Sequence, residues 1–538
     1  MKLVNWLLYE VHRWLGIALA LFMFTWFSTG LVIMYATPTT QNRSQQLAHA
    51  ESLKPEAGWL SLGEVWQRSA EARAANPGPK LSDAGGKQVD IHIPPAIADA
   101  RLVRIGGDPL WLIDDTLGQR YALSALDGSL HRTSVAQALE IARHWSFAET
   151  GKDVSVSLIE TVDNPVILRN QDALKPFHHL AVGNDGLELM ISARTGEILH
   201  VSNPWDRALY YTGNWLHLFK PLESLGWGTI RHDVQLWSGL TATIAGVTGL
   251  VIGWLRWRPG FGDRKTYSQG RTQPYRESWM VWHFWSGLIG GALAIAWALS
   301  GFVSTNPNKW FSDPELSKAE AARFLGDQVP AILQDWTPNP LNGTTAHEIV
   351  EINLRRLGSE AVVLAYGRDG QRLPQVLNGA VNQFSKAGIL AAAQLAIGNA
   401  SLLGSELMTE YDSYYYPRHH QGLIEKPLPV VKLAFADKVG TELYVDPQDG
   451  RVLAKLDQSR RVYRWLYSAL HHWDFGWFYY RPLWDIWMLV WVSFGLVLGA
   501  SSLVIGWRRL KRIAQPKKRR KTSADIAVDK LVSESGVN

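Results

Sequence analysis

The sequence predicts a membrane protein with four transmembrane α-helices and two α+β regions outside the bilayer. Four apolar runs lack any charged residue over about 20 positions, enough to cross a hydrocarbon core of roughly 30 Å. These runs are residues 14–35, 234–255, 278–304 and 486–507. The mean hydropathy of the whole chain is nevertheless −0.09. Large water-exposed segments must therefore accompany the helices, and two long polar stretches supply them.

The apolar runs divide the chain into eight segments. We expect an N-terminal segment with the first helix at 1–36, an α+β region at 37–233, and a second helix at 234–257. A connection at 258–277, a third helix at 278–304 and a second α+β region at 305–482 follow. The fourth helix occupies 483–507, and a basic tail occupies 508–538.

Basic residues near the ends of the helices predict the orientation of the chain. Short cytoplasmic segments carry an excess of Lys and Arg, and two segments have that composition. One is the stretch 256–277, which is the connection with the end of the second helix, and it has Arg256, Arg258, Arg264, Lys265, Arg271 and Arg276. The other is the tail, with Arg508, Arg509, Lys511, Arg512 and the cluster 517–521. We therefore expect both termini in the cytoplasm and both α+β regions on the other side. The net charge of +5 is a topology signal that indicates no nucleic-acid partner, and the 517–521 cluster is expected to be a solvated tail.

The chain contains no cysteine. This excludes disulfides, thiolate-ligated haem and cysteine-held iron–sulfur clusters. Any redox cofactor must therefore be held by histidine or bound non-covalently. The first apolar run is too long for a signal-peptide core and has no clear cleavage site after it, so we interpret it as a retained helix.

A short strand–turn–strand pattern recurs three times in the polar stretches. It starts at Tyr121, Leu189 and Leu443, and each copy reaches its turn at a glycine: Gly128, Gly196 and Gly450. Glycine supplies the positive φ that such a turn requires. Helical stretches at 60–74 and 133–146 precede strands. We expect several small modules, at least two before the second helix and one after the third.

Four histidines lie beside the apolar runs. His12 and His283 fall near the cytoplasmic ends of two helices that run in the same direction, and His217 and His471 lie in aromatic stretches before the two returning helices. Each pair can supply the two axial ligands of a b-type haem, so two haems would carry electrons across the membrane. The alternative is that these histidines are interfacial anchors. His232 and His472 are close enough in sequence to replace His217 or His471.

Other features carry less functional information. Five histidines in the α+β regions are expected to be ordinary surface or core residues: His144, His178, His179, His419 and His420. The Tyr-rich stretch from Glu410 to His420 fits either a substrate or haem-edge surface, or a buried aromatic strand. No Gly-rich nucleotide fingerprint is followed by a βαβ unit. The electron donor is therefore expected to be a quinol or a separate cytoplasmic partner.

Several motifs together resemble the PepSY-associated transmembrane family, over most of the chain. They are Val11-His-Arg-Trp-Leu-Gly, Gly213-Asn-Trp-Leu-His217, Trp282-His-Phe-Trp-Ser-Gly, Ser300-Gly-Phe-Val-Ser-Thr-Asn-Pro, Glu410-Tyr-Asp-Ser-Tyr-Tyr-Tyr-Pro-Arg-His, Leu470-His-His-Trp-Asp-Phe and Tyr480-Arg-Pro-Leu-Trp-Asp. The family includes inner-membrane ferric-siderophore reductases of Gram-negative bacteria. The resemblance implies a multi-pass inner-membrane oxidoreductase with PepSY-like modules in the periplasm, which passes electrons through haem to a ferric siderophore and releases Fe(II). Accessory inner-membrane or periplasmic iron-uptake proteins are implied partners.

Matched residue by residue, the family histidines fall on His12, His217, His283 and His471. In one place the sequence departs from the pattern: relatives often show Trp-His-His where this chain has Trp282-His283-Phe284. His283 is therefore the single ligand candidate in the third helix. Two alternative functions remain open: a haem-containing, quinol-linked supplier of electrons to another periplasmic redox protein, and a haem-free PepSY binding or regulatory protein.

Overall fold

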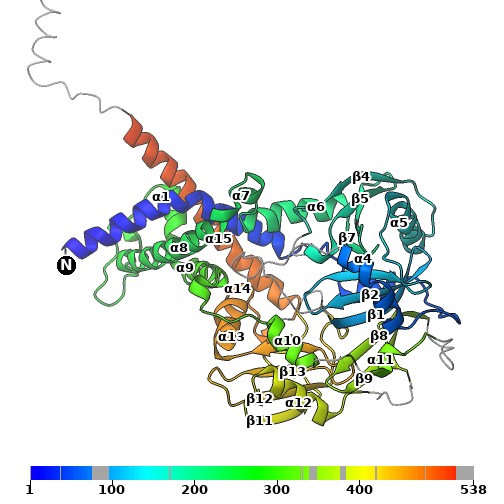
Figure 1. Cartoon of the computed structure of the whole chain (residues 1–538). Coiled ribbons are helices and arrows are strands. Elements are labelled where there is room, and N and C mark those ends of the chain that lie inside the picture. The colour runs from blue at the N-terminus through cyan, green and yellow to red at the C-terminus, as the bar shows by residue number, and fades with distance from the viewer. Residues whose placement is uncertain are drawn as a thin grey trace, which may run out of the picture. The chain divides into compact units, whose positions relative to one another are not determined.

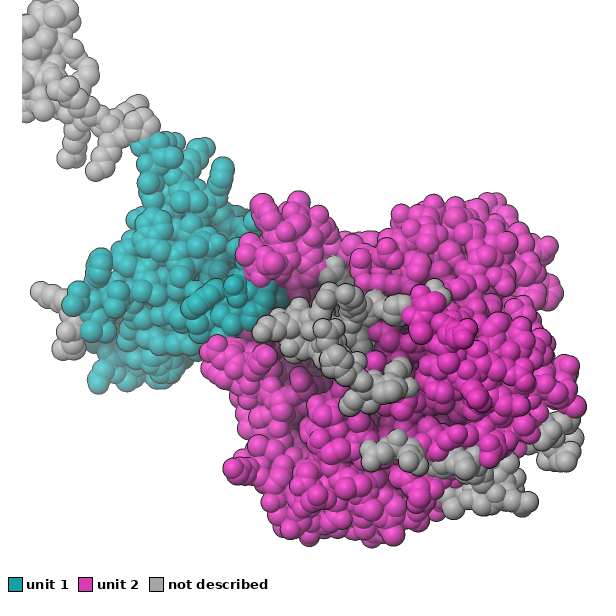
Figure 2. Space-filling model, in the orientation of Figure 1, with its two compact units in different colours: residues 1–31, 232–302, 480–538 teal, residues 32–231, 303–479 magenta. Residues whose placement is uncertain are grey.

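The apolar runs form four long helices in the computed structural model, which describes residues 2–36, 38–75, 96–168, 171–326, 329, 331–338, 348–375, 383–418, 421–478 and 480–515. The chain divides into two compact units (Figure 2). The helical unit comprises Met1–Leu31, His232–Phe302 and Tyr480–Asn538, and the sheet unit comprises Val32–Arg231 and Val303–Tyr479. The 517–521 cluster, His419 and His420 lie outside the described residues.

The helical unit contains α1 (Lys2–Ile33), α8 (Gly228–Arg256), α9 (Ser278–Ser304) and α15 (Leu483–Ala514) (Figure 1). All four are long and apolar enough to cross a membrane, so the prediction of a multi-pass membrane protein with four transmembrane helices is confirmed. Three helices extend beyond their apolar runs because helical hydrogen bonding continues into polar sequence. In α1 this extension places His12 inside the helix, whereas the sequence placed it just before the span.

Small residues allow the four helices to pack closely. A Cβ atom on Gly499 would lie 2.8 Å from the Cα atom of Phe24 in α1, and one on Gly290 would lie 2.7 Å from Cβ of Phe494 in α15. Lipid chains are as apolar as leucine, so helices in a bilayer associate through such close contacts rather than through the hydrophobic effect. Glycine at these positions therefore fixes how α15 packs against α1 and α9.

The described residues of the sheet unit form three antiparallel sheets. One four-stranded sheet consists of β4 (Val156–Val162), β5 (Phe177–Val182), β6 (Leu187–Ser192) and β7 (Ile198–Ser202), and a second consists of β11 (Leu402–Met408), β12 (Val430–Phe435), β13 (Glu442–Val445) and β14 (Val452–Leu456). The third has the order β10-β9-β8-β1-β2-β3, with β1 (Ile97–Ile105), β2 (Asp108–Asp115), β3 (Arg120–Ser124), β8 (Ile349–Leu357), β9 (Glu360–Gly367) and β10 (Arg372–Pro374). The predicted α+β class is confirmed.

Short helices complete the sheet unit. In the first half they are α2 (Arg43–Ala48), α3 (Leu62–Arg68), α4 (Ala70–Ala75), α5 (Val135–Thr150), α6 (Pro204–Tyr210) and α7 (Pro221–Ser224); in the second they are α10 (Lys318–Leu325), α11 (Ala331–Gln334), α12 (Lys386–Ala396), α13 (Gln458–Tyr463) and α14 (Leu470–His472). Helix α5 packs on the β4–β7 sheet through one hydrophobic cluster, and α12 packs on the β11–β14 sheet through another. The two halves therefore have the same order of elements: three strands, a helix and four strands.

The three glycine turns and the three sheets can be compared with the modules that the sequence predicted. Gly128, Gly196 and Gly450 have φ values of 80°, 77° and 70°, so the predicted positive φ is confirmed at all three turns. The two four-stranded sheets are each built from one region. The six-stranded sheet is shared, because β1 of the first region pairs with β8 of the second. Of the modules expected before the second helix, the β4–β7 sheet is built from the first region alone, whereas the sheet that contains β1 is completed by a strand from the other region.

A buried carboxylate lies at the seam between β1 and β8. Glu351 is 4% exposed, and Arg43 donates to both its oxygens at 2.9 and 2.5 Å. Arg101 of β1 lies 3.5 Å from the same carboxylate. Burial alone would raise the pKa of Glu351, but the charges of Arg43 and Arg101 outweigh it and lower this pKa to about 2. The seam is thus held by one ionised carboxylate between two arginines.

Replacing Glu351 by glutamine should destabilise the sheet unit by about 3 kcal/mol at pH 7, because the variant leaves the half-buried Arg43 without its counter-charge, while Arg101 keeps Glu197 as a partner. The pKa of Glu351 is lower in the folded state than in the unfolded state. Its contribution is therefore complete above pH 4.5 and disappears as the pH falls towards 2. Urea unfolding followed by tryptophan fluorescence measures the loss. The matched control is Glu348→Gln, whose partner Arg368 is at the surface and whose midpoint should barely move; equal midpoints in both variants would contradict the prediction.

Candidate functional site

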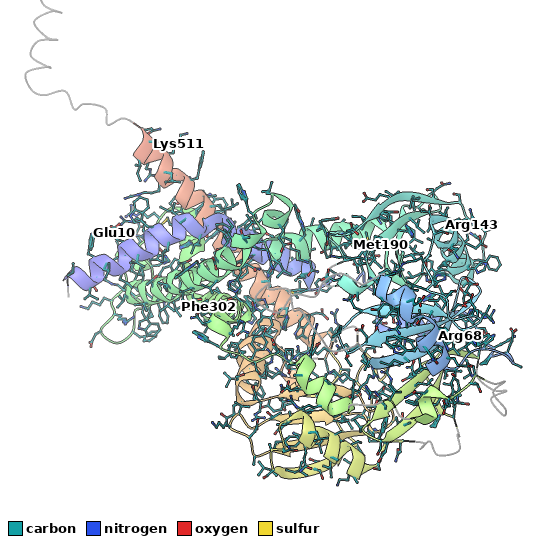
Figure 3. All side chains as sticks on the ribbon, viewed as in Figure 1. Glu10, Arg68, Arg143, Met190, Phe302 and Lys511 are labelled. Carbon is teal, nitrogen blue, oxygen red and sulfur yellow. The ribbon has the colours of Figure 1, made fainter. Side chains whose placement is uncertain are left out.

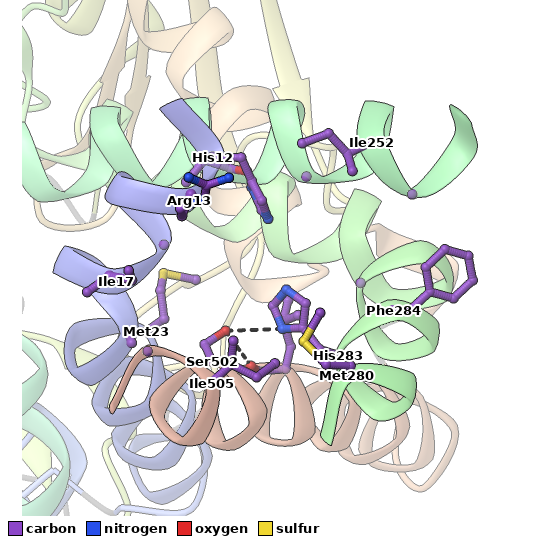
Figure 4. A pocket seen from close by; sticks show the side chains of 18 of the residues that line it. His12, Arg13, Ile17, Met23, Ile252, Met280, His283, Phe284, Ser502 and Ile505 are labelled. Atoms are coloured by element: carbon purple, nitrogen blue, oxygen red, sulfur yellow. Dashed lines mark hydrogen bonds between the residues drawn. The ribbon is translucent and has the colours of Figure 1, made fainter. Parts of the chain in front are cut away.

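His12 and His283 meet inside the helical unit. Their ring centres are 6.2 Å apart, with an angle of 46° between the ring planes. Both line one cavity, and Figure 4 shows the two rings projecting into it from α1 and α9. The structure therefore brings together the two histidines that helix direction had paired.

The hydrogen bond of His12 identifies its tautomer. Its Nδ1 atom lies 3.0 Å from the carbonyl oxygen of Ala245 in α8, and a carbonyl can only accept, so Nδ1–H donates. The other ring nitrogen, Nε2, then carries the lone pair of a neutral imidazole. A metal-binding histidine commonly donates its second N–H in this way, which fixes the orientation of the ring.

His283 has the same tautomer for a different reason. Its Nδ1 atom lies 3.3 Å from the hydroxyl oxygens of Ser501 and Ser502 in α15. Both hydroxyls donate their own hydrogens to the carbonyl of Leu498, at 2.9 and 2.7 Å. Their oxygens are therefore left to accept from Nδ1–H of His283. Figure 4 marks the contact between His283 and Ser502 with a dashed line. The lone pair of Nε2 faces away from these contacts.

The cavity between the four helices has a volume of about 650 Å³, within the range of roughly 300–1,000 Å³ found for small-molecule and cofactor sites. Apolar residues from all four helices form most of its wall. Glycine at position 249 of α8 allows the close approach of His12, since a Cβ atom there would lie 3.0 Å from Nδ1 of that ring. The shape of the cavity thus depends on glycine at this position as well as on the histidines.

One end of the cavity is rich in arginine, and Glu277, which also lines it, pairs with Arg508 at 2.7 Å. Arginines of α1, α8 and α15 line it: Arg13, Arg256, Arg508, Arg509 and Arg512. Arg256 donates to the hydroxyl oxygens of Tyr9 and Tyr275, at 3.2 and 2.8 Å. Because these hydroxyls accept from Arg256, each keeps its own hydrogen for another acceptor. The basic end of the cavity is therefore suited to carboxylates or phosphates.

His217 and His471 form a second pair, inside the sheet unit. Their ring centres are 6.3 Å apart, with the ring planes at 74°. Both histidines are half-buried, and the ring of Tyr467 lies 5.3 Å from that of His471. The structure again brings together the two histidines that the sequence had paired.

Equivalent backbone features lead to His217 and to His471. A π-helical turn precedes each, Tyr211–Trp215 in one half and Arg464–Ala469 in the other. Two residues after each histidine, a bulky aromatic residue has positive φ: Phe219 at 53° and Trp473 at 52°. π-helical turns and left-handed non-glycine residues are uncommon and gather at functional sites. The repetition of both features indicates that the same local backbone structure positions the rings of His217 and His471.

The Tyr-rich stretch supports the segment that carries His471. Asp474 is 1% exposed; it accepts a hydrogen bond from the Tyr416 hydroxyl and lies 3.4 Å from Nε of Arg418. Arg464, at the start of the π-helical turn, donates to the backbone carbonyl of Asp474 at 2.8 Å. Tyr415 is fully buried, and the stretch forms bends rather than a strand. The predicted aromatic strand is therefore wrong, whereas a role as a haem-edge or substrate surface stays a prediction.

The other histidine candidates have ordinary surroundings. His232 is 55% exposed beside Asp233, and His144 is exposed beside Glu140. Both ring nitrogens of His178 contact threonine oxygens at 2.9 Å. His472 is exposed next to His471. Among these, only His472 lies against a predicted ligand pair.

Sequence reasoning missed several residues around the His12–His283 pair. Ser501 and Ser502 are ordinary small residues of a membrane helix, and nothing in one sequence distinguishes them. The two glycines of the cavity wall could have been found from a repeat in the sequence. His12-Arg-Trp-Leu-Gly16 and His283-Phe-Trp-Ser-Gly287 share the pattern His-x-Trp-x-Gly, and both glycines line the cavity. The contact between Arg256 and Tyr9 could not be predicted from the sequence, because it depends on how α1 and α8 pack.

Comparison with known protein families finds a match over more than half of the chain. The PepSY-associated TM region matches residues 9–345 of the chain. The match includes His12, His217 and His283 and ends before His471. No curated protein matches the sequence.

Proposed function

Because the chain belongs to the PepSY-associated TM region family, we propose that it is an oxidoreductase of the bacterial inner membrane. It carries two b-type haems and passes electrons across the membrane to a periplasmic ferric siderophore, which then releases Fe(II). The observation that carries this proposal is the separation of the two histidine pairs, 6.2 and 6.3 Å between ring centres. The basic end of the helical unit faces the cytoplasm, in line with its arginines, and the sheet unit faces the periplasm.

The residues present fit axial ligation by two histidines. A five-membered ring with bonds of about 1.33 Å has its atoms about 1.1 Å from its centre. A metal–imidazole bond is about 2.0 Å long, so two imidazoles on opposite sides of one metal ion have centres roughly 6 Å apart. Both observed separations agree with this value. In the helical unit, the donor atom Nε2 of each ring is the one left free by hydrogen bonding, and the cavity beside the rings has the volume of a cofactor site.

Haem supplies one-electron redox chemistry, and this chain's residues determine where and how readily it acts. His12, held by a backbone carbonyl, and His283, held by two serines, are the proposed ligands in the helical unit; His217 and His471 are those in the sheet unit. Arg256 and the hydroxyls of its tyrosine partners are placed to bind carboxylates at the cavity mouth. The apolar wall excludes water, which stabilises the less charged, reduced state of an iron centre.

Reduction of a ferric chelate needs one electron and no acid–base catalyst. Siderophores bind Fe(III) far more tightly than Fe(II), so one electron from a reduced haem loosens the metal. The electron comes from a quinol or a cytoplasmic donor. The protein's tasks are therefore to hold the haems, to tune their potentials and to admit the chelate.

A visible difference spectrum of the detergent-purified protein tests the proposal. Dithionite-reduced minus oxidised spectra, with haem quantified per chain, should give about two b-type haems. The reduced protein should then re-oxidise on mixing with ferrioxamine, in step with capture of Fe(II) by ferrozine. A colourless protein from cells supplied with haem precursor would refute haem binding. Two haems without re-oxidation would retain the haem assignment and refute the siderophore as substrate.

A further inference from the structure

A row of three potential metal ligands crosses the β4–β7 sheet. His179 in β5 is the direct cross-strand partner of Met190 in β6, and Met190 is the direct partner of His200 in β7. Directly opposed residues of an antiparallel pair place their side chains on the same face, about 5 Å apart at Cβ. Met190 is labelled in Figure 3, in the sheet unit.

The row faces away from helix α5. Leu189 and Ile191, on either side of Met190, pack with α5 in one hydrophobic cluster, whereas Met190 belongs to another. Side chains alternate between the faces of a strand, so His179, Met190 and His200 share the face opposite to α5. Burial on that face is deep: Met190 is 5% and His200 1% exposed, and the side chain of His179 is 15% exposed.

Each imidazole has one nitrogen engaged and one without a hydrogen bond. Nε2 of His179 lies 2.9 Å from the carboxylate of Glu188, and that of His200 lies 2.9 Å from the hydroxyl oxygen of Ser202. In the part of the chain that the structure describes, both Nδ1 atoms are buried without a hydrogen-bond partner. Nδ1 of His179 lies 3.8 Å from the Glu160 carboxylate, which is too far for a hydrogen bond.

The hydrogen bonds of the Nε2 atoms determine which nitrogen of His179 and of His200 carries the lone pair. A carboxylate only accepts, so His179 donates from Nε2–H and bears its lone pair on Nδ1. A buried N–H without an acceptor is costly, so His200 also carries its hydrogen on Nε2, towards Ser202, and its lone pair on Nδ1.

We propose that His179, Met190 and His200 form a binding site for a soft monovalent metal ion, Cu(I). Two imidazoles on either side of a thioether form a donor set suited to Cu(I), because thioether sulfur is a soft ligand and imidazole also binds copper, whereas Mg(II) takes oxygen ligands. The second nitrogen of each ring donates to an oxygen, as in established histidine–metal sites. Among the described residues, no group of three or more His, Cys, Asp or Glu is arranged to hold a metal. The site therefore depends on the sulfur of Met190.

Glu160 marks the open side of the site. Its side chain is 59% exposed and lies nearest to the partly exposed His179. An incoming cation thus meets a carboxylate at the surface before it reaches the buried sulfur. Binding causes no redox change and does not involve the histidine pairs proposed to hold haem.

Copper binding by the purified full-length protein tests the site. Cu(I), kept reduced with ascorbate, is competed against bathocuproine disulfonate, and protein-bound copper is measured by atomic absorption after desalting. The wild-type protein should retain one more equivalent than Met190→Leu, a change that nearly conserves volume, and the variant's affinity should fall at least tenfold. His179→Gln should behave in the same way. His144→Ala, an exposed histidine on α5, is the matched control and should bind copper as the wild type does.

X-ray absorption identifies the ligands directly. The copper edge of the wild-type protein should show one sulfur and two nitrogen scatterers, with the sulfur lost in Met190→Leu. Equal copper retention in the wild type, Met190→Leu and His179→Gln would overturn the proposal, as would equally tight binding of Zn(II). The His283→Ala variant should keep the copper site. Failure of the haem proposal and failure of the copper site are therefore distinguishable.

Discussion

Replacing His283 with alanine is expected to lower the haem content from about two to about one per chain. Alanine removes the only imidazole that α9 presents to the cavity, and His12 alone cannot supply both axial positions. The variant leaves an apolar space beside Ser501 and Ser502, whose hydroxyls lose their acceptor role. Haem quantified per chain by its pyridine complex measures the loss. Added imidazole, which fits the space left by the truncated side chain, should restore part of it.

The control for this variant is His232→Ala. His232 also belongs to the helical unit, but its side chain is 55% exposed and lies beside Asp233. It should keep both haems. Full haem retention in His283→Ala, in protein that remains folded, would disprove the assignment of His12 and His283 as a ligand pair.

Replacing His471 with alanine is expected to abolish reduction of ferric siderophore, with a loss of at least about 100-fold, since weaker disturbances of metal surroundings already cost 10- to 100-fold. The haem of the helical unit should remain and should still be reduced by dithionite. The reduced variant should therefore be stable on mixing with ferrioxamine, whereas the wild-type protein is expected to re-oxidise. Stopped-flow absorbance distinguishes the two outcomes.

His472→Ala is the matched control for His471→Ala. The two residues are adjacent and their rings lie 5.3 Å apart, but His472 is exposed, and it is His471 whose ring lies 6.3 Å from that of His217. Loss of haem in His472→Ala, with retention in His471→Ala, would assign the ligand to the neighbouring residue. Loss in neither variant would exclude a haem at the second pair.

The membrane helices could be predicted from sequence because their signal is local. A run of apolar residues forms a helix in a bilayer whatever its neighbours are, since every backbone polar group must be satisfied within the segment. The histidine pairs followed from helix direction alone: parallel helices bring equivalent ends together. The structure contains both pairs, while haem ligation stays a prediction.

The parts that sequence reasoning missed depend on contacts between distant segments. Pairing of β1 with β8 joins strands from different halves of the chain, and alternation of apolar residues identifies a strand but not its partner. The hydrogen bonds of His283 likewise depend on which face of α15 packs against α9. The role of Asp474 was hidden because an acidic residue between aromatic residues usually indicates an exposed turn, whereas here two arginines and a tyrosine accompany it into the interior.

The shared six-stranded sheet has a consequence for biogenesis. Translation at roughly 5–20 residues per second delivers β8 on the order of 10 to 50 s after β1, and only after α8 and α9 have been inserted into the bilayer. During that interval β1 presents an open edge, the kind of surface on which chains aggregate. The six-stranded sheet is therefore completed only after α8 and α9 have been made, and until then the edge of β1 needs cover from another surface.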